Sequence, residues 1–190
     1  MTASAYDWSS TLKGFHDQAW KSLARGVADR RAAARHPTLA TVGLNGGAEA
    51  RTVVLRAADR TDGMLELHTD RDSEKVAELH ANPAASLHIW DLRVRMQIRL
   101  RVLIRCHQGA LATERWQQVP SVSRWAYGGN PAPGGLIHRP TDYRADTDVD
   151  RFMLLLCTVQ SMELLHLAED GHRRALFRRA DGFAGNWLAP

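Results

Sequence analysis

The chain has 190 residues, of which 44% are hydrophobic and 24% are charged, and its formal net charge at pH 7 is +4. This composition predicts one globular domain that is large enough to bury a core. The longest unbroken apolar run, 152–157, is far shorter than the roughly 20 residues that a membrane helix needs. The polar first ten residues lack the apolar core of a signal peptide. We therefore expect a cytoplasmic protein with no membrane partner, whose Cys106 and Cys157 are reduced thiols.

Arginine dominates the basic residues, since only Lys13, Lys21 and Lys75 among the 25 are lysines. A guanidinium group matches carboxylates and phosphates, so the excess indicates either a phosphate-bearing partner or only the base composition of the gene. A nucleic acid is one such partner. However, the arginine-rich segment 94–105 has no interleaved aromatic residues for base stacking, and the net charge is modest. We expect no nucleic-acid partner.

Several nucleotide-binding and metal-binding motifs are missing from the sequence. It contains no Walker loop, no GxGxxG spacing, no HExxH pair and no CxxC pair. We therefore expect neither a nucleotide-hydrolysing protein nor a Rossmann or zinc protein, and we expect no metal site.

The N-terminal part of the chain reads as one helix followed by a hairpin. Apolar residues recur at intervals of three and four, which predicts an amphipathic helix over 11–33. The β-branched segment 38–44 predicts a strand. Asn45-Gly46-Gly47 then supplies a tight turn, and 50–57 is the expected return strand.

The middle of the chain reads as alternating strands with one short helix. A third strand is expected over 64–69, a helix over 73–80 and a fourth strand over 84–90. In 94–105 apolar residues alternate with arginines and a glutamine, which predicts a long strand with one buried face.

The C-terminal part begins with a short helix over 111–119. The segment 121–150 is rich in proline and glycine and predicts a long loop, which at this length is usually functional or flexible. One or two strands over 152–167 and a return strand over 173–178 complete the chain. We expect a single domain over 1–190, built as a closed or partly open β-barrel of six or seven strands.

The residues 51–75 hold the most specific group of candidate anion ligands. Arg51 and Arg56 are five positions apart, so on a regular strand they would point to opposite faces unless a bulge or strand end intervenes. Ser73 lies at a helix N-terminus, a natural anion site, and Lys75 adds a positive charge there. From spacing alone, the favoured explanation is a capped surface helix beside a solvated arginine strand.

Five ordered motifs resemble the pyridoxamine 5'-phosphate oxidase family of FMN-binding proteins. RTVVLR, LHTD, DSEKVAEL, NPAASLHIW and MQIRLRV lie within 37–105, and the terminal WLAP is a weaker echo. The resemblance implies a mainly β fold with flanking helices, the FMN-binding split β-barrel. It also implies a homodimer with FMN between the subunits. The implied reaction is hydride transfer from a small substrate to flavin N5, followed by reoxidation by dioxygen or another acceptor.

The resemblance also implies roles for individual residues. The FMN phosphate and ribityl chain would be held by Arg51, Arg56, Ser73 and Lys75. The isoalloxazine ring would lie beside Val53, Val54, Leu55 and Thr69, and Gln97 would hydrogen-bond it. Arg174 of the partner subunit would complete the site.

The chain departs from the family pattern at several positions. Glu74 stands in place of a second basic residue, Leu165 in place of a tryptophan, and Asp170 in place of the arginine of an R-x-H substrate motif. In these features the chain resembles the divergent, pyridoxamine phosphate oxidase-related branch, and the substrate and the proton-transfer residue stay open. His172 and Arg124 are the catalytic candidates. The alternative is a non-catalytic flavin- or haem-binding split-barrel module.

Overall fold

The structure is a computed structural model and describes residues 7–190. The first six residues of the expected 1–190 domain therefore lie outside the described residues. Nine antiparallel strands form one sheet in this part of the chain. They are β1 (Thr38–Val42), β2 (Ala48–Thr52), β3 (Leu55–Asp59), β4 (Met64–Asp70), β5 (Ala84–Asp91), β6 (Met96–His107), β7 (Phe152–His166), β8 (Arg173–Arg178) and β9 (Asn186–Leu188).

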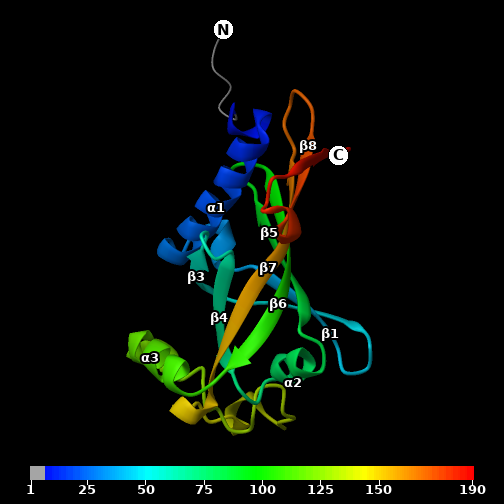
Figure 1. Cartoon of the computed structure of the whole chain (residues 1–190). Coiled ribbons are helices and arrows are strands. Elements are labelled where there is room, and N and C mark those ends of the chain that lie inside the picture. Colours follow the sequence, from blue (N-terminus) through cyan, green and yellow to red (C-terminus); the bar gives the residue numbers. More distant parts are fainter. Residues whose placement is uncertain (1–6) are drawn as a thin grey trace.

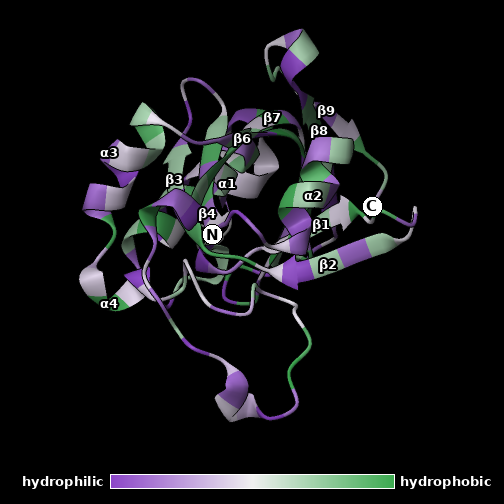
Figure 2. Ribbon diagram, turned by 90° about the horizontal axis from the view of Figure 1, so that it is seen from below, coloured by the Kyte–Doolittle hydropathy of each residue, from purple (hydrophilic) through white to green (hydrophobic). Residues whose placement is uncertain are grey.

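Four α-helices flank the sheet (Figures 1 and 2). They are α1 (Leu12–Ala28), α2 (Glu74–Ala81), α3 (Ala110–Gln118) and α4 (Ser121–Arg124). Helix α1 lies along the upper part of the long strands, whereas α2 and α3 lie on opposite sides of their lower end. The prediction of a mainly β fold with flanking helices is confirmed, although the strands number nine rather than six or seven.

The expected return strand over 50–57 is wrong, because the chain forms two strands there. The main path of the sheet runs β2-β1-β5-β6-β7-β4-β3, so β2 and β3 are its two ends. Only Val53 and Val54 separate these two strands. Two residues span about 10 Å at most, so the sheet must curl until its edges nearly meet, without closing into a barrel. Val53 leaves the ladder by donating its N–H to the Pro37 carbonyl over 3.0 Å.

The N-terminal helix is shorter than the expected 11–33. The Thr11 side chain accepts a hydrogen bond from the Gly14 N–H and so caps the start of α1, but the backbone is already extended at Asp29. The Asp29 carboxylate accepts hydrogen bonds from the Arg31 N–H and the Arg25 guanidinium. This local pairing competes with helix propagation. The chain then makes a separate 3-10 turn at Ala33–Arg35.

The core lies between the inner face of the curled sheet and α1. Phe15, Ala19 and Leu23 of α1 are fully buried, as are Ile98 and Leu100 of β6. A second, smaller cluster holds α3 and the following loop against the start of β7. Its buried members are Ala112, Trp116, Val119, Tyr127, Phe152 and Leu154.

The long loop expected over 121–150 contains α4 and two 3-10 turns, Pro140–Asp142 and Val149–Arg151, joined by irregular backbone. Figure 2 shows its middle part extending away from the strands. None of the described helices is long and apolar enough to cross a membrane.

Candidate functional site

A cavity of about 310 Å³ opens where the break between β2 and β3, the end of β4, the start of α2 and the long loop meet. We call it the cradle cavity. Its lining includes Thr52, Val53, Val54, Arg56, Thr69, Ser73, Lys75 and Tyr127. Eight of the ten cofactor-binding residues expected from the sequence come from this region, 51–75, and six of them line the cavity itself.

Arg56 reaches the cavity because of a β-bulge. The register between β3 and β4 shifts between Leu55 and Ala57, so Arg56 is the extra residue of the ladder. A bulge redirects a side chain relative to a regular strand. The Nε atom of Arg56 is buried and has no hydrogen-bond partner among the described residues, and the guanidinium forms no ion pair with any of them.

Lys75 is the second cation of the cavity. Its Nζ atom donates to Thr69 Oγ1 over 3.2 Å, and it has no carboxylate partner among residues 7–190. Burial lowers the pKa of Lys75, and the nearby Arg51 guanidinium lowers it further. Both influences disfavour an isolated ammonium group. A bound anion would relieve the same penalty, so Arg56 and Lys75 together indicate an anion site.

Ser73 and Thr69 supply hydroxyl groups to the same wall. Ser73 is the N-cap residue of α2, yet its hydroxyl donates to the Asp70 carbonyl over 2.7 Å and lies 3.1 Å from Thr69 Oγ1. Its side chain therefore does not cap the first turn of α2. The N-terminus of a helix attracts anions. The start of α2 and the two cations beside it therefore favour the same kind of ligand. Glu74, the first residue of α2, is exposed to solvent.

Arg51 lies next to this group but does not line the cavity. Its Nη2 atom is 2.9 Å from Oε2 and 3.0 Å from Oε1 of Glu78, and its Nη1 atom also contacts Thr41 Oγ1. Glu78 is fully buried in α2. Arg51 thus neutralises a buried carboxylate, and a phosphate contact by Arg51 stays a prediction.

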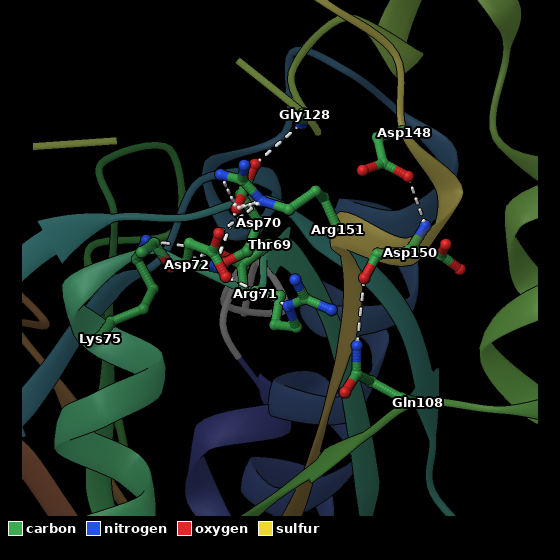
Figure 3. Close-up of polar contacts among 11 residues, drawn as sticks. Thr69, Asp70, Arg71, Asp72, Lys75, Gln108, Gly128, Asp148, Asp150 and Arg151 are labelled. Carbon is green, nitrogen blue, oxygen red and sulfur yellow. Dashed lines mark hydrogen bonds and ion pairs between the residues drawn. The ribbon is translucent and has the colours of Figure 1, made fainter. Parts of the chain in front are cut away.

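Asp70 anchors the long loop over the cavity (Figure 3). Its Oδ1 accepts from Arg151 Nη2 over 2.8 Å and from Nε over 3.0 Å, while its Oδ2 accepts from the Gly128 N–H over 2.8 Å. The neighbouring Asp148 N–H donates to the Tyr127 carbonyl over 2.9 Å. No local sequence pattern indicates this network, because Asp70 and Arg151 are 81 positions apart.

Gln97 and Arg174 lie far from the cradle cavity of the same chain. Both face Leu165 of β7 across the ladder, whereas Thr69 faces Met153. Leu165 and Met153 are twelve positions apart on β7, which is roughly 40 Å along the strand. A single chain therefore does not bring these two predicted residues to its own cavity.

Arg174 is also engaged by a carboxylate. Its Nη2 and Nε atoms lie 2.5 Å and 3.0 Å from Glu163 Oε1, and Arg99 pairs with the other oxygen. Burial alone would raise the pKa of Glu163, but the hydrogen bonds from Arg174 and Arg99 outweigh it and lower that pKa.

The two catalytic candidates lie outside the cradle cavity. Arg124 donates to the Val119 and Trp116 carbonyls over 3.0 Å and 3.2 Å, and its guanidinium carbon lies 5.0 Å from the centre of the Trp116 ring. These contacts satisfy carbonyl groups at the C-terminal end of α3. His172 is exposed in the turn between β7 and β8. Catalytic roles for both residues stay predictions.

Comparison with known proteins places this geometry in context. Residues 17–108 match the model of the pyridoxamine 5'-phosphate oxidase FMN-binding domain. A pyridoxine/pyridoxamine 5'-phosphate oxidase from Thermosynechococcus vestitus is 36% identical over 88 residues, which are 46% of this chain and 41% of that protein. The match thus spans about two fifths of the length of this curated relative.

Two solved structures share the fold over nearly the whole chain. One is a pyridoxamine 5'-phosphate oxidase-related, FMN-binding protein from Nostoc punctiforme, with a TM-score of 0.76 and 23% identity, covering 93% of this chain and 97% of that one. The other is PhzG from Burkholderia lata in complex with tetrahydrophenazine-1-carboxylic acid, with a TM-score of 0.73 and 18% identity, covering 92% of each chain. The fold is therefore that of these split-barrel proteins. Residues 17–108, which hold most of the residues that line the cradle cavity, are thus similar to the pyridoxamine 5'-phosphate oxidase FMN-binding domain.

Proposed function

We propose that the protein is an FMN-dependent oxidoreductase that acts on a small substrate, with the FMN phosphate bound in the cradle cavity. One observation carries this proposal. Arg56 and Lys75 border one cavity and have no carboxylate partner among the described residues, and Arg56 Nε is buried without a hydrogen bond. Buried cations are normally paired, so the chain fits a dianionic phosphate at this position.

The other expected contacts fit the same arrangement. Ser73 and Thr69 would offer hydroxyl groups to the phosphate and ribityl chain, and the backbone of Val53–Leu55 would border the ring. Bound FMN would supply a ring that accepts two electrons from the substrate. The protein would contribute binding, orientation and exclusion of water, and the anchored loop over the cavity supports that task.

An FMN titration followed by flavin fluorescence and absorbance tests the proposal. We expect saturable quenching with one FMN per chain. Lys75→Met should weaken binding at least tenfold, because a charge-assisted hydrogen bond to phosphate is worth roughly 1.5–3 kcal/mol. Lys21→Met, which removes an exposed lysine from α1, is the matched control. Unchanged flavin fluorescence at saturating protein would refute the proposal.

We also propose a homodimer in which Gln97 and Arg174 of one subunit approach the FMN of the other. The distance along β7 supports this arrangement, because the two residues do not reach the cavity of their own chain. Subunit mixing tests it. A homodimer of either variant, Lys75→Met or Gln97→Ala, carries its substitution in both FMN sites. A heterodimer of the two variants carries both substitutions in one site and leaves the other site intact. Re-equilibrated mixtures should regain about a quarter of the wild-type binding capacity, and separate subunit sites should regain none.

A second candidate is a flavin-binding module without turnover. The observation that favours it is the position of His172 and Arg124, neither of which lines the cradle cavity. Hydrogen peroxide release with pyridoxamine 5'-phosphate as the substrate separates the two candidates. An oxidase would release peroxide in proportion to substrate consumed, whereas a binding module would release none while still quenching FMN.

A further inference from the structure

A second cavity, of about 440 Å³, adjoins the cradle cavity and lies between β3, β4 and α3. We call it the side chamber. Its lining includes Arg35, Arg56, Glu66, His68, Arg115 and Gln118. Arg56 and His68 line both cavities, so they form the wall between them.

The side chamber carries excess positive charge. Three guanidinium groups line it, but Glu66 is its only carboxylate among the described residues, and Glu66 pairs with Arg115 over 3.1 Å. Arg35 donates to the carbonyls of Val27 and Leu55 over 3.0 Å and 3.2 Å and has no ion pair with a described residue. Burial lowers the pKa of Arg35, and the neighbouring Arg56 guanidinium lowers it further. Neither Arg35 nor Arg56 is therefore paired with a carboxylate of the described residues.

His68 is held in one orientation and one tautomer. Its Nε2 atom lies 2.8 Å from Glu66 Oε1, and its ring packs edge-on against Phe152 at 4.8 Å. Burial would raise the pKa of Glu66, but hydrogen bonds from His68 and Arg115 lower it, so Glu66 is a carboxylate and only accepts. The hydrogen of the neutral imidazole therefore resides on Nε2.

The other nitrogen of His68 is left as an acceptor. Nδ1 is buried and has no hydrogen-bond partner among the described residues, and only 7% of the side chain is exposed. Burial lowers the pKa of His68, the Glu66 carboxylate opposes this, and the Arg56 and Arg115 guanidinium groups add to the lowering. The ring is thus neutral at pH 7, and a buried unpaired acceptor is costly unless a ligand donates to it.

We propose that the side chamber binds a small organic anion that also carries an N–H or O–H group, with Arg35 and Arg56 binding the anionic end and His68 accepting the hydrogen bond. The assignment of the side chamber as the substrate site of an enzyme rests on the proposed function. Binding itself does not, because the side chamber has charges and an acceptor of its own.

Calorimetric titration of the full chain with matched probes tests the assignment. The probes are the three aminobenzoate isomers, benzoate, which lacks the donor, and aniline, which lacks the anion. At pH 7.5 we expect at least one aminobenzoate to bind roughly tenfold tighter than benzoate, the value of one hydrogen bond to a buried acceptor. Aniline should show no binding. Equal affinities for benzoate and all three aminobenzoates would overturn the role of His68.

His68→Gln separates the two ring nitrogens. The glutamine amide can still donate to Glu66, but the acceptor at Nδ1 is lost. The variant should bind the preferred aminobenzoate only as tightly as benzoate, with the affinity for benzoate itself unchanged. His80→Gln, at an exposed position of α2, should keep the preference. A preference that survives in His68→Gln contradicts the proposal.

Two further measurements use the wild-type chain and need no substitution. Lowering the pH until His68 is protonated turns Nδ1 into a donor, so the preference for aminobenzoate over benzoate should vanish in the wild-type chain. Repeating the titration with added FMN should weaken aminobenzoate binding only to a limit that more FMN does not exceed, because the two ligands share Arg56 but occupy different cavities. Competition with FMN would place the probe in the cradle cavity and overturn the assignment. Failure to bind FMN, with the aminobenzoate preference intact, would refute only the proposed function.

Discussion

The Arg51–Glu78 ion pair lies beside the cradle cavity, and its contribution to the stability of the fold can be measured directly. Glu78 is completely buried, and it accepts from Arg51 and from the Thr41 hydroxyl, the latter over 2.6 Å. Arg51→Gln leaves a buried carboxylate without its cation, which typically costs 3–5 kcal/mol. For a chain of this length each kcal/mol lowers Tm by about 2–4 °C, so we expect a decrease of roughly 6–20 °C.

Urea unfolding of Arg51→Gln, Glu78→Gln and the double variant measures the coupling. Glu78→Gln should cost less than Arg51→Gln, because the Arg51 side chain is 22% exposed and can turn to water. The double variant should be more stable than the sum of the single effects predicts, by about 1–3 kcal/mol. A cost below about 1 kcal/mol for Arg51→Gln, with no coupling, would refute the reasoning. FMN titration of the folded Arg51→Gln protein then shows whether Arg51 also contacts the phosphate.

Two further predictions concern the loop and the pH dependence. Gly128 has φ +115°, and a Cβ there would lie 2.8 Å from the Asp148 backbone nitrogen, so Gly128→Ala should release the loop and speed proteolysis within 121–150. Gly134→Ala, with φ +87° and open space around it, controls for backbone strain alone. Because burial lowers the pKa of His68, the unfolded chain binds a proton first as the pH falls below about 6.5. Stability should therefore decline from pH 7 towards the lowered folded pKa, and His68→Gln should reduce that decline in urea midpoints measured at pH 7.5 and 5.5.

Local patterns predicted the part of the site that is local in the chain. Thr69, Ser73 and Lys75 lie within seven residues, and a strand end followed by a helix start necessarily brings them together. The requirement for a bulge or strand end between Arg51 and Arg56 also followed from the period of a strand. The structure has both, a break at Val53–Val54 and a bulge at Arg56.

Contacts between residues that are far apart in the chain could not be predicted from the sequence. The run from 50 to 57 has the composition of one continuous strand, and what divides it is a hydrogen bond to Pro37 together with two different neighbouring strands. Glu66 and Arg115 are 49 positions apart, so no local pattern relates them. Periodicity predicts which face of an element is buried, but it does not identify the residue on another element that will meet it.

Among the many arginines of the chain, the ion-pair partner of each one determines whether it is available to bind an anion. Arg51, Arg115 and Arg151 all border the region of the two cavities, yet each is neutralised by a buried or half-buried carboxylate. Arg56 and Lys75 look no different in the sequence, but they have no such carboxylate among the described residues. An anion bound beside a neutralised arginine gains little, because the guanidinium must first give up its existing pair. The same anion beside Arg56 and Lys75 would remove a penalty that folding leaves in place, and this difference is the reason for proposing the phosphate site in the cradle cavity.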